Sequence, residues 1–315
     1  MKIIVLFGGL SPEAEVSASS AKQISEHLEA AGHQTVALNL NGNYKQVADF
    51  ETLYEMKEDL KAVSTDKTVE ITPATLELAK LADICFLATH GGIGENGQLQ
   101  VLLELNKIKF TGNRFLSTAV AMDKTLSKRL MRENKVGLAK EYHAQEVSEA
   151  AFPLVVKPNA SGSSIGVYFP KNMDEFNQLD LTDALIEQQL FGREFSVGVI
   201  DGVALPPIEI VVTKGFYDYQ SKYNTGFVQE ICPSDISNAL DLKLRAAAQY
   251  CHEQIGFEVY SRAEFIVDQE EKIWFIESNS IPGMTPTSLL PQEAAVVGMN
   301  YTALCEKIIE LSLKL

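Results

Sequence analysis

The chain contains few cysteines, and their spacing argues against several kinds of site. Its 315 residues include only four, Cys85, Cys232, Cys251 and Cys305, which are far apart in the sequence and form no CxxC pair. A disulfide framework or a zinc site would show a closer and more regular pattern, so we expect free, buried thiols in a reducing compartment. This pattern predicts a cytoplasmic protein.

Positive charge is scarce as well. The chain has 27 lysines and arginines against 42 acidic residues, which gives a formal net charge of -15. Such a balance argues against general binding of nucleic acid or of an anionic membrane. It leaves a nucleotide site open, because a bound phosphate responds to local lysines and to helix N-termini.

Long apolar runs are missing too. No run reaches the roughly 20 residues that a membrane-spanning helix needs. The apolar run at residues 3–7 is followed by glycines, which is typical of a buried first strand rather than a signal peptide. Hydrophobic residues make up 46% of the chain and charged residues 22%, as in ordinary globular proteins. A chain of this length can form two or three domains.

The first third alternates between strand and helix patterns. The expected strands cover residues 2–7, 34–40, 82–89 and 108–112, and the expected helices cover 17–32 and 99–106. This alternation predicts a parallel, Rossmann-like α/β sheet with crossover helices. Ligands of such sheets gather beyond the carboxyl ends of the strands, where this chain carries the loops 8–17 and 89–97.

The remaining two thirds are organised differently. A helical stretch at 118–137 precedes a strand, a Gly/Ser loop and a second strand, and from about Glu194 the chain is rich in strands. Further expected strands cover 152–159, 167–170 and 184–190, and further helices cover 172–179 and 300–315. We therefore predict three domains, at residues 1–122, 123–194 and 195–315.

Two segments near the C-terminus alternate polar and apolar residues. Residues 262–268 and 272–279 are separated by a short polar stretch, which predicts an antiparallel hairpin. The pairing of the two strands depends on where the turn lies, and we place its centre at Glu270 and Glu271.

This pairing places acidic residues face to face. Glu264 lies opposite Glu277, and Arg262 lies opposite Asn279. Facing carboxylates destabilise a sheet unless a cation lies between them, and Mg²⁺ with oxygen ligands and substrate phosphates would supply that charge. A solvated hairpin face is the alternative, and a slip of one residue would separate the acidic pair.

Two glycine-containing loops suggest ligand contact. Residues 92–97 (GIGENG) match the dinucleotide fingerprint GxGxxG, but they follow the third expected strand, and no acidic residue ends the next one. A turn that lets the backbone approach a ligand explains them better than a nicotinamide site. Residues 161–166 (SGSSIG) are rich in N–H and hydroxyl donors for phosphate, with an exposed loop as the alternative. Lys157 ends an apolar strand just upstream, where a phosphate partner would offset its burial.

Several other polar residues occupy positions that a ligand could reach. Glu187 and Glu194 flank a Gly turn and would suit an adenine amino group and ribose hydroxyls, or simply lie on the surface. The aromatic segment 216–226 is typical of a surface loop or a lid. Glu15 could hold an ammonium group, whereas His90 is either structural or catalytic.

The turn after the hairpin contains two further candidates. Gly283 can bring its N–H close to a reacting group. Ser288 precedes an expected helix, whose N-terminal N–H groups bind carboxylates well.

Taken in chain order, these segments resemble the D-alanine–D-alanine ligases of the ATP-grasp superfamily. The resemblance rests on EVS at Glu15, HGG at His90, MDK at Lys124, VVKP followed by GSSIG, GREF, KY at Lys222, and ESNSIPGMT followed by SL. It extends from the first strand to about Pro291, and the C-terminal block is its most specific part. It implies a three-domain α/β ATP-grasp fold, with ATP held between the central and C-terminal domains.

The resemblance also implies an activity and its partners. The reaction would be the ATP-dependent ligation of two D-alanine molecules through an acyl phosphate, in the service of peptidoglycan synthesis. The implied cofactors are ATP and two Mg²⁺ ions, which Mn²⁺ could replace. The implied partners are these small molecules and a second copy of the chain in a homodimer, with neither nucleic acid nor membrane.

The functional residues of the family fall on matching positions of this chain. The implied ATP-binding residues are Lys124, Lys157, Ser163, Ser164, Glu187, Leu190, Glu194, Phe216 and Lys222, and the implied metal ligands are Glu264, Glu277 and Asn279. The implied substrate-binding residues are Glu15, His90, Arg262, Ser288 and Leu289. The implied catalytic residues are Glu15, Ser163 and Tyr223, a hydrogen-bonded trio that closes the loop, and Arg262 with the Gly283 N–H, which stabilise the tetrahedral intermediate.

The chain departs from the family pattern at four positions. Glu264 stands where Asp is usual, and Ser161 replaces an acidic residue of the Ser/Gly loop. Ser278 stands where Ala or Val is usual, and Ile281 where a small polar residue is usual. These differences keep open an ATP-grasp ligase for a different amino-acid pair. Two further alternatives are a nicotinamide-dependent oxidoreductase that uses residues 92–97 and a catalytically silent nucleotide-binding module.

Overall fold

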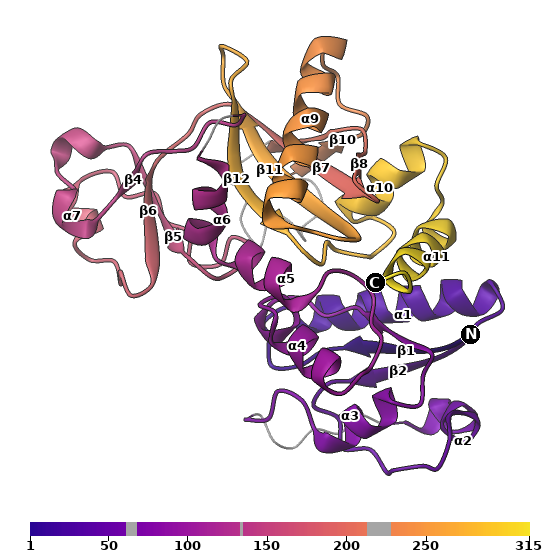
Figure 1. Cartoon of the computed structure of the whole chain (residues 1–315). Coiled ribbons are helices and arrows are strands. Elements are labelled where there is room, and N and C mark those ends of the chain that lie inside the picture. Colours follow the sequence, from indigo (N-terminus) through magenta and orange to yellow (C-terminus); the bar gives the residue numbers. More distant parts are fainter. Residues whose placement is uncertain (61–67, 133–134, 213–227) are drawn as a thin grey trace.

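The computed structural model describes residues 1–60, 68–132, 135–212 and 228–315. These residues form three sheets. Figure 1 shows the N-terminal sheet at the bottom, a large C-terminal sheet at the top, and a small sheet at the left that carries α7. The α/β class predicted from the sequence is confirmed, and the boundaries near residues 122 and 194 stay predictions.

The N-terminal sheet is parallel, as predicted. β1 (Lys2–Phe7) lies between β2 (Gln34–Asn39) and β3 (Ile84–Leu87). Alternate residues of β1 point to opposite faces, and both faces are buried. Ile3 packs in a cluster with residues of α1 (Ala14–Ala30) and α11 (Tyr301–Ser312). Ile4 points to the opposite face and packs in a second cluster, which includes Phe50, Leu78 and Leu99.

Several elements of this region differ from the prediction. The expected strand at 108–112 is only a parallel bridge between Cys85 and Phe110, because Gly112, with φ of 97°, turns the chain away. Helices that the sequence pattern did not reveal lie between β2 and β3. They are α2 (Phe50–Glu55), η1 (Lys57–Asp59) and α3 (Pro73–Ala79). After β3 follow η2 (Gly92–Gly94) and α4 (Gln98–Leu105), and α4 is the helix expected at 99–106.

The helical stretch expected at 118–137 is divided in the structure. The structure has two helices, α5 (Phe115–Met122) and α6 (Lys124–Met131), separated by Asp123 in an extended conformation. The Asp123 carboxylate accepts the Leu126 N–H at 2.8 Å and so caps α6. This local cap competes with helix continuation and places Lys124 at the first position of α6.

The small sheet is antiparallel, with β6 (Ala184–Gln188) between β4 (Glu141–Tyr142) and β5 (Leu154–Pro158). The strand expected at 167–170 is reduced to one bridge between Val156 and Tyr168, because Pro158 and Pro170 have no N–H to extend it. The remaining helices of this region are η3 (Ala144–Glu146), η4 (Glu149–Ala151) and α7 (Met173–Phe176).

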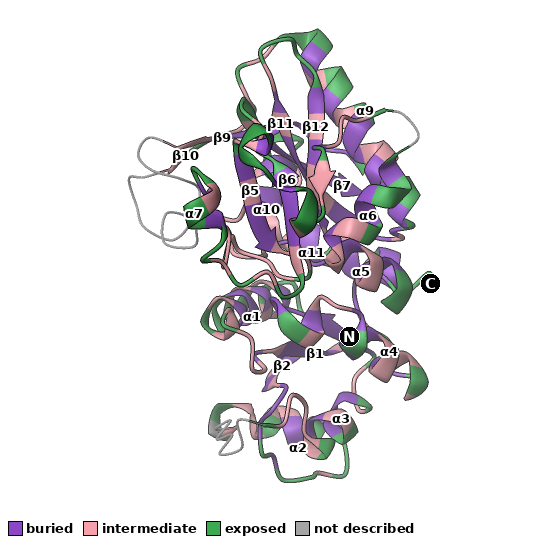
Figure 2. Ribbon diagram, turned by 90° about the vertical axis from the view of Figure 1, so that its left-hand side faces the viewer, coloured by how far each residue is buried: buried purple, intermediate pink, exposed green. Residues whose placement is uncertain are grey.

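The large sheet has the strand order β10-β9-β7-β11-β12, and β8 pairs with β7. Its strands are β7 (Arg193–Ile200), β8 (Val203–Ala204), β9 (Ile208–Val212), β10 (Val228–Ile231), β11 (Tyr260–Val267) and β12 (Ile273–Asn279). The helix α9 (Asn238–Ile255) packs on it, and α10 (Leu289–Val296) contacts β7. Figure 2 shows the exposed residues of α9 in green on its outer side.

The hairpin register near the acidic residues is confirmed. β11 and β12 pair Glu264 with Glu277 and Arg262 with Asn279. Beyond this pair the register shifts, since Phe265 lies opposite Phe275. Ile276 is therefore the additional residue of a β-bulge, a feature that the alternation did not reveal.

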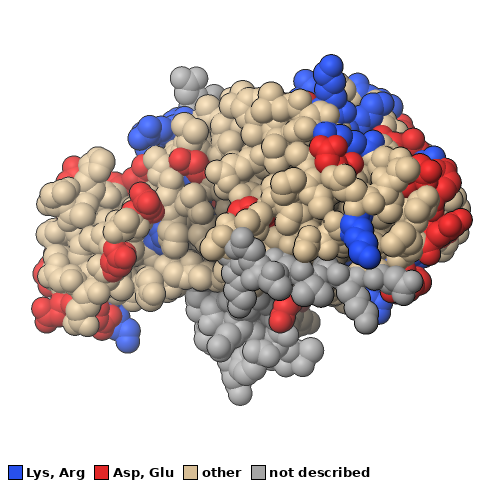
Figure 3. All heavy atoms as spheres, turned by 90° about the horizontal axis from the view of Figure 1, so that it is seen from below, with Lys and Arg blue, Asp and Glu red and all other residues tan. Residues whose placement is uncertain are grey.

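The surface carries charges of both signs. Viewed from below, the centre of the molecule is mostly uncharged, and acidic and basic groups lie largely toward its ends (Figure 3). Among the helices that the structure describes, none combines the length and apolar character that a membrane crossing requires.

Candidate functional site

A pocket lies between the small and large sheets. Its apolar lining includes Val155, Ile165, Val167, Phe169, Ile266 and Ile276, and its charged lining consists of Lys124, Lys157, Glu187, Glu194, Glu264 and Glu277. Ser164 and Leu190 line it as well. The pocket therefore brings together most of the predicted ATP-binding residues and two of the predicted metal ligands.

Two buried lysines share one carboxylate at the side of the pocket. Lys157 Nζ lies 2.8 Å from Glu187 Oε2, and Lys128 Nζ contacts the other oxygen of the same carboxylate. Burial opposes ionisation of Glu187, yet the two lysines hold the pKa of its carboxyl below the ordinary value. Burial, together with the Lys157 charge, lowers the pKa of Lys128 to about 8. Lys157 thus has a protein partner that the sequence could not reveal.

Lys124 connects three segments around the pocket. The N-terminal position on α6 places its side chain in the interior, where only 6% is exposed. Its ammonium donates to the Ser161 carbonyl in the Ser/Gly loop and lies 3.1 Å from Glu277 Oε2 on β12. A polyphosphate in this pocket would meet both Lys124 and Lys157.

The facing carboxylates of the hairpin are neutralised by the chain itself. Glu277 has Lys124 as its partner, and Arg262 donates to Glu264 Oε1 at 2.7 Å. Each carboxylate of the pair therefore has a cationic partner within the chain, and the predicted metal site stays a prediction. No cluster of three or more His, Cys, Asp or Glu suited to a metal occurs among the described residues. Two carboxylates and the Asn279 amide still form an oxygen-donor set, and Mg²⁺ usually completes such a set with substrate phosphates.

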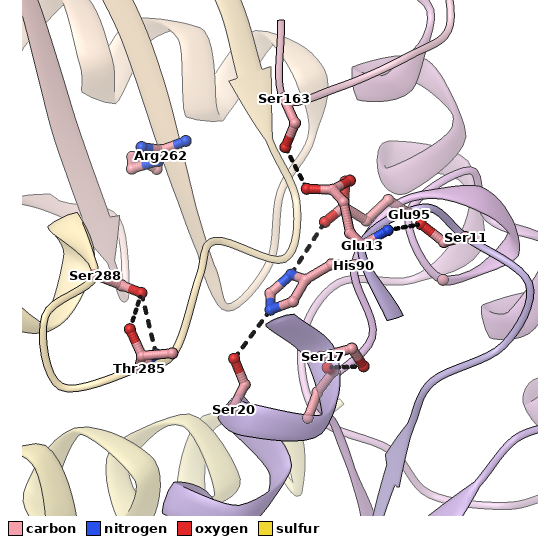
Figure 4. Close-up of polar contacts among 12 residues, drawn as sticks. Ser11, Glu13, Ser17, Ser20, His90, Glu95, Ser163, Arg262, Thr285 and Ser288 are labelled. Atoms are coloured by element: carbon pink, nitrogen blue, oxygen red, sulfur yellow. Dashed lines mark hydrogen bonds and ion pairs between the residues drawn. The ribbon is translucent and has the colours of Figure 1, made fainter. Parts of the chain in front are cut away.

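The Ser/Gly loop reaches from the small sheet to the N-terminal region. Ser163 and Ser164 both have positive φ, of 54° and 56°, a conformation that costs free energy in residues other than glycine. The Ser163 hydroxyl donates to Glu13 (Figure 4). The predicted contact between Ser163 and Glu15 is replaced by this one, because Glu15 is exposed in the first turn of α1.

His90 is a buried residue in the loop that follows β3. Its Nε2 lies 3.1 Å from the Ser20 hydroxyl on α1, and its Nδ1 lies 3.6 Å from Glu95 Oε1 (Figure 4). These contacts fix the imidazole between α1 and the loop that follows β3. They account for its burial, and its predicted part in substrate binding stays a prediction.

The turn after β12 places Gly283 beside Ser288. A Cβ atom at Gly283 would lie 2.9 Å from Ser288 Oγ, so only glycine fits without displacement. The Ser288 hydroxyl accepts the Thr285 N–H at 3.1 Å and precedes α10, whose first residue is Leu289. The N–H groups at the start of α10 are therefore near Gly283.

Three predicted residues lie outside the described residues: Phe216, Lys222 and Tyr223. Two others in the site were not foreseen. Lys128 lies four residues after Lys124 on the same face of α6, a spacing that could have indicated it. Glu13 precedes Glu15 in the same loop, and no sequence signal distinguishes the two acids.

Two family models together match most of the chain. The model described as D-ala D-ala ligase N-terminus matches residues 2–113, and the model described as D-ala D-ala ligase C-terminus matches residues 119–310. Among curated proteins, the chain is similar to the D-alanine–D-alanine ligase of Pediococcus pentosaceus, with 38% identity over 98% of this chain and 97% of that protein.

Two solved structures show the same fold. One is the Bacillus anthracis D-alanine–D-alanine ligase complexed with ATP, with a TM-score of 0.78, 28% identity, and coverage of 100% of this chain and 98% of that one. The other is the VanG D-Ala:D-Ser ligase of Enterococcus faecalis, with a TM-score of 0.79, 25% identity, and coverage of 99% of both chains.

Proposed function

Since the chain belongs to the D-alanine–D-alanine ligase family, we propose that it joins two D-alanine molecules in an ATP-dependent reaction for peptidoglycan precursor synthesis. The observation that carries this proposal is a pocket in which Lys124 and Lys157 lie near the facing pair Glu264 and Glu277. Lysines beside paired carboxylates suit a metal-bound polyphosphate.

ATP would lie between the small and large sheets. The apolar walls suit adenine, with Glu187 and Leu190 at its amino edge and Glu194 at the ribose. Lys124 and Lys157 would bind the phosphates, and Ser163 and Ser164 would cover them. The predicted contributions of Phe216 and Lys222 concern residues outside the described ranges.

Glu264, Glu277 and Asn279 would hold two Mg²⁺ ions, which Mn²⁺ could replace. Such ions neutralise the triphosphate and make its terminal phosphorus easier to attack. The carboxylate of the first D-alanine would then attack this phosphorus, and ADP would leave. The product of this step is an acyl phosphate, which water must not reach.

Peptide-bond formation would follow at the other end of the site. Glu13, which takes the place expected for Glu15, and His90 would lie near the first D-alanine, and Ser288 and Leu289 at the start of α10 would hold the carboxylate of the second. The amine of the second D-alanine would attack the acyl carbon and displace phosphate. Arg262 and the Gly283 N–H would donate to the developing oxyanion, an arrangement that can contribute several kcal/mol.

Closure over the intermediate would depend on Ser163. Its contact with Glu13 supports an attachment of the Ser/Gly loop to the N-terminal region, in which Glu13 takes the place expected for Glu15. Tyr223 would complete this attachment, as the resemblance implies.

A ligase for a different amino-acid pair is the second candidate. The D-Ala:D-Ser ligase among the similar structures and the unusual Glu264 favour it. Ile281 does not, because its side chain is only 3% exposed and packs in the core of the N-terminal sheet. Phosphate release with ATP, Mg²⁺ and single amino acids separates the two. We expect release with D-alanine alone, and release only with a second amino acid would favour the alternative.

We also propose that the enzyme is a cytoplasmic homodimer, as the resemblance implies. Static light scattering of the purified protein tests the oligomeric state. A mass near twice the 34.7 kDa of one chain is the expected result, and the mass of one chain would refute it.

A further inference from the structure

The interior face of α6 includes two lysines, where a surface helix usually has apolar residues. The buried residues of this eight-residue helix are Lys124, Ser127, Lys128 and Met131. Lys128 has no exposed surface at all, a position in which lysine occurs almost only when it is paired. Its only role cannot be to fill space, because an apolar side chain would do so without the cost of burying a charge.

Lys128 lies one layer behind the pocket. Glu187 and Lys157 are lining residues of the pocket, but Lys128 is not. Its ammonium contacts Glu187 Oε1, while Glu187 Oε2 lies 2.8 Å from Lys157 Nζ. The three groups form a row: the Lys128 ammonium lies in the interior, the Glu187 carboxylate comes next, and the Lys157 ammonium lies in the pocket.

The charges of these three side chains explain why the carboxylate lies between the two ammonium groups. Lys157 lies diagonally across the β5–β6 pair from Glu187, so the two side chains are on one face of the small sheet. Without Lys128, Lys157 would be the close counter-ion of a carboxylate that is 1% exposed, and a phosphate would have to compete for it. With Lys128 present, the carboxylate is already neutralised, and the three groups carry one net positive charge.

We propose that Lys128 is a positioning residue for ATP: it neutralises Glu187 and thereby leaves the Lys157 ammonium available to phosphate. An ammonium group has three donors, and Glu187 occupies one of those of Lys157. This inference rests on the proposed function, because it takes the pocket to be the ATP site. It adds a residue that contacts no substrate.

Calorimetric titration with Mg²⁺ and ATP, in the absence of amino acid, tests the role of Lys128. Lys128→Met is expected to weaken ATP binding at least about tenfold and to raise the KM for ATP by a similar factor, while the KM for D-alanine stays within about twofold. Arg129→Met is the matched control, because it removes a positive charge from an exposed position of the same helix. It should leave ATP binding unchanged.

The double variant distinguishes positioning from mere structural support. Glu187→Gln needs no counter-ion, so adding Lys128→Met to it should change ATP affinity by less than about twofold. This comparison also holds if Lys128→Met alone fails to fold. Equal losses in the wild-type and Glu187→Gln backgrounds, or an unchanged ATP affinity in Lys128→Met, would overturn the proposal. Failure of the proposed function would instead appear as an inactive wild-type enzyme.

Discussion

The charged residues of the pocket show how far single positions can be interpreted from sequence. Lys157 is conspicuous because it ends an apolar strand, and that pattern correctly indicates a buried cation in need of a partner. The sequence suggested a phosphate, whereas the structure places Glu187 beside it. The partner comes from a strand 30 positions later in the chain, and no local pattern encodes such a pairing.

Lys157 provides the most direct residue-scale prediction. Lys157→Ala should lower kcat/KM for ATP by about 100-fold or more, because the pocket loses a charge that would neutralise phosphate. The fold should survive, since Lys128 remains as the counter-ion of Glu187. Coupled measurement of ADP release, with thermal unfolding as the control for folding, checks this. Near-normal kinetics in a folded variant would contradict the assignment of the phosphate site.

The attachment of the Ser/Gly loop gives a second prediction at this scale. Glu13→Gln and Ser163→Ala should each raise the KM for ATP, and the double variant should be no worse than the more severe single one, because the two side chains make one contact. Glu15→Gln is the comparison and should leave the Ser163→Ala effect unchanged. Additive losses for Glu13 and Ser163 would show that their contact does not matter.

At the scale of elements, the regular pattern was easier to predict than its interruptions. The alternation in β11 and β12 gave the facing pair of Glu264 and Glu277, because the pleat has a period of two. It did not give the bulge at Ile276. The break at Asp123 was missed for the same reason, since a side-chain cap depends on one hydrogen bond rather than on periodicity.

His252 connects the helix α9 to the strand β11, and its burial leads us to expect that the stability of the fold depends on pH. Its Nδ1 lies 2.8 Å from the Ser261 hydroxyl, which links α9 to β11, and burial lowers the pKa of His252 to about 4. The unfolded chain takes up a proton near pH 6.5, and the folded chain only near pH 4. The neutral imidazole therefore contributes stability above pH 6.5 that is lost as the pH falls toward 4, by about 3 kcal/mol in all.

Urea unfolding of the wild type and of His252→Gln tests this contribution. The wild type should lose stability faster than the variant between pH 7 and pH 4.5, because glutamine does not titrate. The carboxylates titrate in both proteins and cancel in the comparison. A difference in free energy that is constant across this range would contradict the burial of a neutral histidine.

At the scale of the whole molecule, the order of motifs was more informative than any one of them. The sequence predicted a parallel sheet followed by a strand-rich region, and the structure has both. The sequence did not predict which residues connect the parallel sheet to the strand-rich region. The buried Asn113 connects the N-terminal region to the strand-rich region. Its side-chain NH₂ donates to the carbonyls of Tyr260 and Ser280. Its side-chain oxygen accepts the N–H groups of Glu258 and Val259.

The same junction clarifies how the site is assembled. Glu13 and His90 come from the N-terminal sheet, Ser163 from the loop of the small sheet, and Arg262 and Ser288 from the large sheet and the segment that follows it (Figure 4). Residues from three regions can act on one substrate only if these regions keep a fixed relation. The packing of α11 against α1 and the Asn113 hydrogen bonds supply contacts between two of them.

Formation of the dipeptide is the decisive test of the proposed activity. The purified protein is incubated with ATP, Mg²⁺ and a mixture of D-amino acids, and the products are identified by mass spectrometry, with Glu277→Gln as the control. D-alanyl-D-alanine is the expected main product with the wild type, and very little of it is expected with the variant. A different dipeptide, or ATP hydrolysis without any dipeptide, would contradict it.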